Sequence, residues 1–214
     1  MAGTSRTKSQ ASRAERSRLT RARVVAAATD LFVAQGYLQT TMADIARGAD
    51  VAVQTLYLSF GSKVAVLSAA LDVAIVGDDE PVPVLERAWF TALRETPDGP
   101  AALALFVEAA GRIIERVYPL YAVTRDGSTD PELAEVLATN KQLRFVVHSQ
   151  VARELAGKSG FRPVLTAERA GQVIYTLMSQ ETYGLLVVEH GWSRHDWADW
   201  VRHHLQTELF GPAD

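Results

Sequence analysis

Cysteine is absent from this chain of 214 residues, which excludes disulfides, thiolate nucleophiles and cysteine-based zinc sites. No apolar run approaches the roughly 18 residues that span a bilayer. The N-terminus is polar and basic without the apolar segment of a secretory signal. Nucleophile-elbow, phosphate-loop and dinucleotide fingerprints are also missing. We therefore expect a cytoplasmic protein that is not an enzyme, with no cofactor, no catalytic residue and no membrane partner.

The charges are unevenly distributed along the chain. Residues 1–70 carry nine Lys and Arg against four acids, a net charge of +5, and the whole-chain value of −3 leaves −8 for residues 71–214. A basic N-terminal part is what attraction to nucleic-acid phosphates requires. Residues 1–18 mix basic residues with Ser, Thr and Gln, and predict a disordered arm that follows phosphates or enters the minor groove; the alternative is a solubilising tail.

Apolar periodicity predicts an all-α fold of about nine helices, with no β pattern of weight. The expected helices are 19–35, 42–47, 52–57, 62–76, 84–95, 100–123, 131–156, 167–190 and 194–210. Their boundaries rest on capping residues such as Ser62, Thr166 and Ser193, on Pro131 at a first turn, and on Gly36 as a stop. Pro119, inside one of these helices, should kink it.

The most informative segment runs from Thr41 to Lys63. Thr41 is a good N-cap, with Asp44 in the capping-box position. The sequence Gly48-Ala49-Asp50 interrupts two short helical patterns, and Val51 can fill the angle between them. Such an arrangement predicts a helix-turn-helix, a three-helix domain that places its last helix in the DNA major groove. A small helical hairpin without a DNA role has the same spacing.

The side chains around this turn suggest how DNA would be contacted. Gln54 can read a base edge, most naturally adenine, and Thr and Val can meet a thymine methyl group. Hydroxyl groups and Lys63, at the start of the next helix, can bind phosphate. The predicted DNA-binding residues are Thr41, Ala52, Val53, Gln54, Thr55, Tyr57, Ser59 and Lys63.

Residues 21–71 resemble the DNA-binding domain of TetR-family transcriptional regulators. The matching positions, in order, are Ala26-Ala27-Ala28, Leu31-Phe32, Gly36-Tyr37, Thr41, Asp44-Ile45-Ala46, Thr55-Leu56-Tyr57, Phe60 and Ser62-Lys63. Three positions depart from the family pattern: Asp50 stands where Gly is usual, Ala52 replaces a Ser cap, and Gln54 replaces a frequent Gly. The resemblance implies a helix-turn-helix domain over 19–62 and an effector-binding and dimerisation domain over 63–214, joined through helix 62–76.

In that family the second domain usually holds a small effector among its middle helices. An apolar wall with a few polar groups is typical of ligand sites. For any single aromatic residue, core packing is the alternative. The predicted effector-binding residues are Phe106, Tyr118, Phe145, His148 and Tyr175.

The last two helices have apolar stripes that are wide for a chain end. They predict a two-fold dimer interface, which reading two half-sites of a palindromic operator requires. The alternative is that they complete their own core. The predicted interface residues are Val173, Leu177, Gly184, Val188, Trp197, Val201 and Leu205.

Together these features predict a homodimeric, DNA-binding transcriptional regulator, a repressor released by a small-molecule effector of unknown identity. One alternative is a dimeric regulator without a small ligand. Another is a metal-binding or enzymatic helical protein, since His195, Asp199 and His203 recur every four residues on helix 194–210, a spacing that can hold a metal. A solvated face explains the same spacing, and we predict no metal site.

Overall fold

The computed structural model describes residues 3–77 and 82–211, with side chains from residue 15 onward within those ranges. Helices are the regular elements of the described chain, and one isolated bridge joins Asp98 and Ser159. The prediction of an all-α fold is confirmed. The elements are α1 (Gly3–Gln39), α2 (Met42–Gly48), α3 (Val53–Phe60), α4 (Lys63–Val76), the 3₁₀ turn η1 (Val84–Glu86), α5 (Ala88–Glu95), α6 (Gly99–Asp126), α7 (Pro131–Ala156), α8 (Ala167–Leu177), α9 (Gln180–Tyr183), the π-helical turn η2 (Gly184–Glu189) and α10 (Arg194–Phe210).

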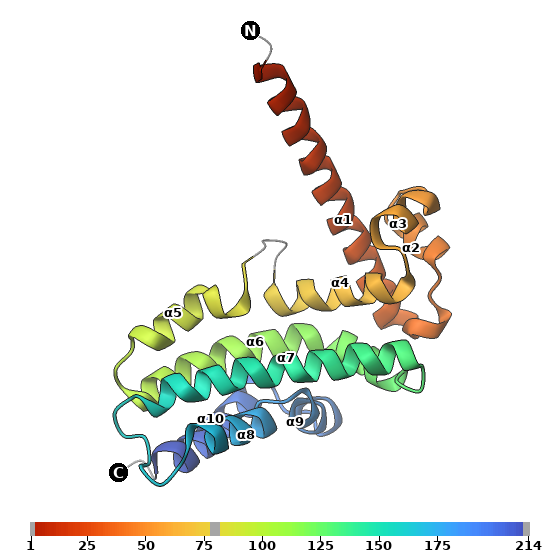
Figure 1. The fold of residues 1–214 in the computed structure, drawn as a ribbon. Coiled ribbons are helices and arrows are strands. Elements are labelled where there is room, and N and C mark those ends of the chain that lie inside the picture. The colour runs from red at the N-terminus through yellow and green to blue at the C-terminus, as the bar shows by residue number, and fades with distance from the viewer. Residues whose placement is uncertain (1–2, 78–81, 212–214) are drawn as a thin grey trace.

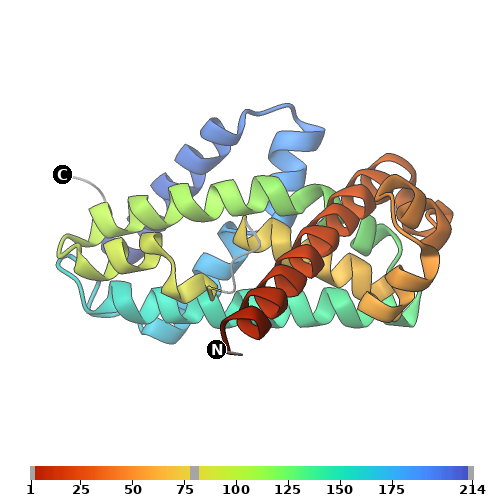
Figure 2. The same ribbon diagram turned by 90° about the horizontal axis from the view of Figure 1, so that it is seen from above.

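The two longest helices of the body, α6 and α7, lie antiparallel and side by side in a central layer (Figures 1 and 2). In Figure 1 the helices α4 and α5 cover this layer from above, and α8, α9 and α10 cover it from below. At one end, α2 and α3 pack beside α1, whose N-terminal part rises away from the body (Figure 1). The short pair α2–α3 is therefore held at one end of a layered helical body.

Local capping explains where several helices begin. Thr41 and Asp44 form the predicted capping box at α2, because each side chain binds the other residue's backbone N–H. Ser62 caps α4, Asp130 caps α7 and Ser193 caps α10, each accepting a hydrogen bond from a backbone N–H of the first turn. These starts agree with the sequence prediction to within one or two residues.

Two hydrophobic cores hold the layers together. One lies among α5, α6, α7, α8 and α10, and Trp197 and Phe106 are among its largest buried side chains. The other is built by α1 to α4 together with the second half of α6 and the start of α7, through Val117, Leu120 and Leu133. Helices α1 and α4, which support the helix-turn-helix pair α2–α3, therefore pack on α6 and α7, and a shift in these elements changes that support.

The start of α1 differs from the predicted disordered arm. The helix begins at Gly3, and its true end is Gly36, where φ is +81°. Between these two glycines the sequence has neither Gly nor Pro, and it is rich in Ala and Arg, which favour helix. The side chains of Arg6, Lys8 and Arg13 lie outside the described residues.

The predicted helix 167–190 is broken in the structure. Met178 has ψ of 64°, which ends α8, and Ser179 caps the next turn by accepting from the N–H of Thr182. The chain then passes through α9 into η2. Arg87 likewise separates η1 from α5, because its extended backbone interrupts the predicted helix 84–95. Helix α6 runs through Pro119 without a non-helical residue, so the kink stays a prediction.

Considered alone, no described helix is long and apolar enough to cross a membrane. Only α3 and α4 taken together, which are bent by 70° at their junction, pass that test of length and composition.

Candidate functional site

The turn between α2 and α3 has the backbone that the sequence pattern requires. Asp50 is left-handed, with φ of +53°, in the position where the family resemblance places Gly. The N–H of Val51 then binds the carbonyl of Ala46, which closes the turn. Ala52 begins α3 without a side-chain cap, as predicted. Leu56 is the buried anchor of this helix.

The outer face of α3 is exposed although it is largely apolar. Every predicted contact residue on α3, Val53, Gln54, Thr55, Tyr57 and Ser59, is exposed, as are Thr41 and Ala52. Tyr57 is 51% exposed and Leu58 is 82% exposed. Leu58 is not among the predicted contact residues, because an apolar side chain does not by itself indicate an exposed position. Exposed apolar groups gathered on one short helix indicate a surface that another molecule covers.

The ammonium group of Lys63 is not fully free to bind a phosphate, because it already binds backbone carbonyls. Its ammonium donates to the carbonyls of Tyr37 (2.7 Å) and Thr40 (2.9 Å), and it lies 4.1 Å from the centroid of the Tyr37 ring. Burial, opposed by the charge of Asp130, lowers the pKa of Lys63. Since an ammonium has three N–H groups, one donor remains for a phosphate. Lys63 therefore connects the end of α1 to the start of α4, and its predicted phosphate contact can use only the remaining N–H.

The charge around α3 comes from its neighbours, because α3 itself carries no charged residue. Arg47 is exposed on α2 and pairs with Asp44 at 2.8 Å. Arg21 of α1 stacks on the Phe60 ring at 4.5 Å, at the end of α3. An uncharged reading helix flanked by cations fits a division between base contacts on α3 and phosphate contacts beside it.

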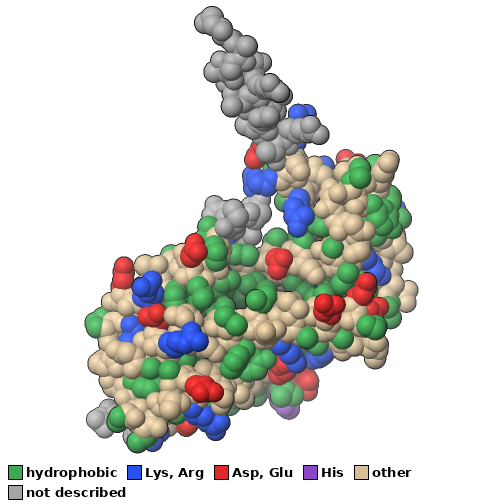
Figure 3. Space-filling view, viewed as in Figure 1, with side chains coloured by type: hydrophobic (Ala, Val, Ile, Leu, Met, Phe, Trp, Pro, Cys, Tyr) green, Lys and Arg blue, Asp and Glu red, His purple; other side chains and the backbone are tan. Residues whose placement is uncertain are grey.

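A cavity of about 460 Å³ opens between α4, η1, α5, α6 and α7. Its size is within the range of small-molecule pockets. Figure 3 shows hydrophobic side chains gathered around a hollow in this face of the molecule. The lining residues are Asp72, Ile75, Val76, Val82, Pro83, Val84, Leu85, Trp89, Phe106, Ala110, Ile113, Ile114, Asn140, Leu143, Arg144, Val146, Val147 and His148.

Of the predicted effector residues, Phe106 and His148 line this cavity, and the other three do not. Tyr118 packs instead against the α9–η2 junction, with its ring 5.3 Å from that of Tyr183. Phe145 is partly exposed and meets Tyr175 edge-on at 5.4 Å, and Tyr175 in turn lies 6.1 Å from the His148 ring. These three residues do not line this cavity, because a helical stripe alone does not show which side faces inward, and their effector role stays a prediction.

An ion-pair network lies behind the cavity wall. Arg144 and Lys141 of α7 pair with Glu181 of α9 at 3.3 and 3.1 Å, and the Tyr121 hydroxyl donates to the same carboxylate at 2.9 Å. Burial raises the pKa of Glu181, but the charge of Arg144 and these hydrogen bonds outweigh it and lower the pKa to about 2. Tyr121 belongs to the core shared with the helix-turn-helix. The network thus connects the cavity wall to that core.

The predicted dimer residues divide into two groups. Trp197, Val201 and Leu205 are fully buried in the chain's own core, so their prediction as interface residues is wrong. Gly184 is also buried, and a Cβ there would lie 2.6 Å from the Tyr118 hydroxyl, which explains the glycine within one chain. The apolar side of α10 faces α6 and α8, as the alternative of a self-completed core requires.

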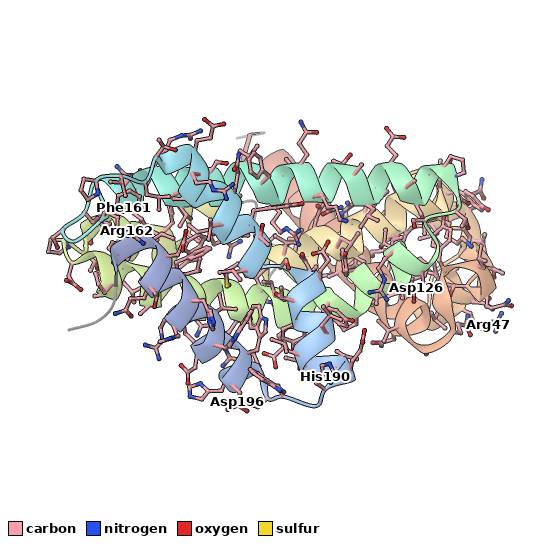
Figure 4. The ribbon with its side chains drawn as sticks, turned by 90° about the horizontal axis from the view of Figure 1, so that it is seen from below. Arg47, Asp126, Phe161, Arg162, His190 and Asp196 are labelled. Carbon is pink, nitrogen blue, oxygen red and sulfur yellow. The ribbon has the colours of Figure 1, made fainter. Side chains whose placement is uncertain are left out.

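Other apolar side chains of this layer point outward. Leu185 is 51% and Val188 56% exposed on η2, and Trp192 follows in the connection to α10. Val173 and Leu177 are half-buried at the edge of the core. Figure 4 shows α8, η2 and α10 on one face, with His190 and Asp196 at the ends of the connection, far from Arg47 at the helix-turn-helix.

The histidines of α10 do not assemble a metal site. His195 pairs with Asp199 at 3.3 Å, whereas the nearest ring to His203 is that of His204. Within residues 15–77 and 82–211, no group of three or more His, Asp or Glu side chains is arranged to hold a metal ion.

Comparisons with known proteins agree with this geometry. Residues 24–70 match the family model of bacterial regulatory proteins, tetR family. No curated protein matches the sequence. Among solved structures, the transcriptional regulator FadR from Bacillus subtilis, in complex with stearoyl-CoA, is 18% identical with a TM-score of 0.69, over 89% of this chain and 98% of that chain.

Two further solved structures have the same fold. FadR from Bacillus halodurans, a fatty acid degradation regulator, is 18% identical with a TM-score of 0.66, over 86% of this chain and 93% of that one. A transcriptional regulator from Saccharomonospora viridis, in complex with choline, is 16% identical with a TM-score of 0.65, over 88% and 96% of the two chains. The N-terminal part of this chain is therefore a TetR-family DNA-binding domain, and the chain as a whole has the fold of a TetR-family transcriptional regulator.

Proposed function

We propose that this protein is a homodimeric repressor that binds a palindromic operator and leaves it when a small molecule enters the cavity. The observation that carries the proposal is the pairing of an exposed, uncharged α3 with a cavity whose wall includes α4. Two structurally similar regulators were solved with small molecules, stearoyl-CoA and choline, which supports a ligand-responsive body. The domain division at residue 62 is part of this proposal.

The DNA contacts proposed are those of the helix-turn-helix surface. Gln54 and Thr55 read base edges from α3, with Val53 against thymine methyl groups. Thr41, Tyr57, Ser59 and the remaining N–H of Lys63 meet phosphates, and Ala52 lets the start of α3 approach the duplex closely. The basic residues at the start of α1 add non-specific attraction.

Release follows from the position of α4. Its last turns supply Asp72, Ile75 and Val76 to the cavity wall, while its first residue, Lys63, binds the carbonyls at the end of α1. A ligand that fits only when the last turns of α4 move would favour a state in which the two α3 helices of the dimer have another separation. Because half-sites lie one helical turn apart or multiples of it, a changed separation weakens operator binding.

Operator binding tests the proposal directly. The operator is first selected from random duplex DNA by the full-length protein, and binding is then measured by fluorescence anisotropy at two salt concentrations. We expect selective, salt-sensitive binding of two chains per palindromic site. Affinity that is equal on selected and random DNA contradicts the function.

Two variants separate base from phosphate contacts. Gln54→Ala should change the preferred base at one position, by about 1–3 kcal/mol, with an unchanged salt slope. Lys63→Met should weaken binding alike on all sequences and reduce the salt slope. Because Lys63 also binds two carbonyls, the unfolding transition of the Lys63→Met variant is measured in parallel to detect a loss of stability. Gln172→Ala on α8 is the matched control, and equal losses from Gln54→Ala and Lys63→Met on every sequence contradict the assignment.

A further inference from the structure

The cavity wall has one polar corner, made by Arg144 and His148. They lie four residues apart on α7, so their side chains share one face of that helix. His148 is only 5% exposed and is bounded by aromatic rings, Phe106 edge-on at 5.7 Å and Tyr175 at 6.1 Å. Its Nδ1 atom is buried and has no hydrogen-bond partner.

Arg144 leaves a second polar atom without a partner. Both terminal nitrogens donate to Glu181 Oε2, at 3.4 and 3.3 Å, and the guanidinium lies 4.4 Å from the Tyr175 centroid. The Nε atom is buried and makes no hydrogen bond. Buried polar groups in folded proteins almost always have partners, so two unpartnered atoms on adjacent turns at a cavity call for an explanation.

Both atoms can donate a hydrogen bond to the same kind of ligand atom. The Nε–H of Arg144 can only donate. Burial, and then the charge of Arg144, lower the pKa of His148 to about 3, so the imidazole is neutral and donates from Nδ1 in one tautomer. An oxygen with two lone pairs can accept from both. A cationic group is disfavoured at this corner, because the two positive charges of Arg144 and Lys141 pair with the single negative charge of Glu181 and leave an excess of positive charge.

The remainder of the wall is suited to an apolar body. Trp89, Phe106 and Ile113 line it together with aliphatic side chains of α4, α6 and α7. Two other polar residues line the cavity. Asp72 is on α4, and Asn140 lies one turn before Arg144 on α7, where its amide donates to the Val136 carbonyl. The cavity thus combines one hydrogen-bonding corner with an apolar remainder.

We propose that the effector is an apolar molecule ending in a carbonyl group, as a carboxylate or an uncharged ester, whose oxygen accepts hydrogen bonds from Arg144 Nε and His148 Nδ1. The apolar part lies along Trp89 and Ile113 and leaves through the opening beside Leu143 and Val146, which line the cavity and are exposed. This inference rests on the proposed function, since it names the ligand class of the same cavity.

Three probes of equal chain length test the head group: decanoic acid, methyl decanoate and decyltrimethylammonium. Binding to the full-length protein is measured by titration calorimetry, with the fluorescence of Trp89 and the other tryptophans as a second readout. We expect the acid, the ester or both to bind one per chain, at least tenfold more tightly than the cation. Binding of the acid alone assigns a carboxylate, and binding of both assigns an uncharged carbonyl as sufficient.

Variants locate the binding. His148→Leu removes the imidazole, and Arg144→Lys keeps the charge facing Glu181 but removes Nε. Each should weaken the carbonyl probes at least tenfold and leave the weak affinity for the cation unchanged, whereas His203→Leu on exposed α10 should change nothing. Ile113→Trp, which fills the cavity, should abolish all binding, and circular dichroism checks that each variant is helical.

The proposal is overturned if the cation binds as tightly as the carbonyl probes, if no probe binds, or if His148→Leu and Arg144→Lys keep full affinity. The proposed function fails separately. A carbonyl probe that binds at this corner but leaves operator affinity unchanged contradicts effector release while the head-group assignment stands.

Discussion

The guanidinium of Arg116 on α6 binds the end of α4, donating from Nε to the carbonyl of Ala74 (3.1 Å) and from Nη2 to that of Ile75 (3.4 Å). The last carbonyls of a helix lack intrahelical donors and carry the negative end of its dipole, so a cation there is stabilising. The next residue along, Val76, lines the cavity. Arg116 thus fixes to the body the turn of α4 that, in the proposed release, the effector displaces.

Arg116→Met should loosen this turn. We expect a loss of about 1 kcal/mol in the free energy of unfolding, since the bonds are exposed and water competes for them. Amide exchange of residues 73–77 should accelerate more than that of α7. Arg112→Met is the control, because Arg112 pairs with Glu108 on its own helix. If amide exchange in α4 is equally fast in Arg116→Met and in Arg112→Met, Arg116 does not hold this turn.

The buried imidazole of His148 predicts acid sensitivity. Burial and then the charge of Arg144 lower its pKa from 6.5 to about 3, so the unfolded chain binds the proton first. Stability is therefore lost as the pH falls below 6.5, by about 2 kcal/mol between pH 7 and pH 5. Urea unfolding of the wild type and His148→Leu at both pH values measures it. If the free energy of unfolding falls equally in the wild type and in His148→Leu between pH 7 and pH 5, His148 is solvated in the folded protein.

The close approach of Gly184 to Tyr118 predicts a coupled pair. A Cβ at residue 184 would lie 2.6 Å from the Tyr118 hydroxyl and 2.9 Å from its ring. Gly184→Ala should therefore destabilise the protein by about 1–3 kcal/mol. In Tyr118→Leu, where that ring is absent, the same change should cost less than half as much. Additive losses in the double variant would place the strain elsewhere.

Local chemistry made much of the fold predictable. The caps at Thr41, Ser62 and Ser193 act within three residues of themselves, so sequence alone marks the helix starts. The sequence also showed that Asp50 stands where the family usually has Gly, and the structure gives this residue the left-handed backbone that Gly adopts readily. These features depend on side chains and backbone that are neighbours in the chain.

The site was less predictable because it depends on which helix face turns inward. Trp197 and Val201 have the spacing of an interface as well as of a core, and only packing against α6 decides between them. Arg144 and His148 could have been paired from their spacing of four residues. The sequence could not show which of their atoms lack a hydrogen-bond partner, because the terminal nitrogens of Arg144 bind Glu181, which is 37 residues away in the chain.

The exposed apolar residues of η2 predict the dimer contact that the buried side chains of α10 cannot make. Leu185 and Val188 are more than half exposed on the same face as α8 and α10, and a second copy that covers them would remove both from water. Leu185→Glu and Val188→Glu should each shift the protein toward monomer, because a carboxylate would be buried in an apolar contact. Sedimentation velocity measures the shift, and Val164→Glu, in the exposed α7–α8 connection, is the control. A wild-type monomer, or variants as dimeric as the control, would contradict this contact. If the variants are monomeric but bind a single half-site normally, the loss of operator affinity comes from the dimer and not from α3.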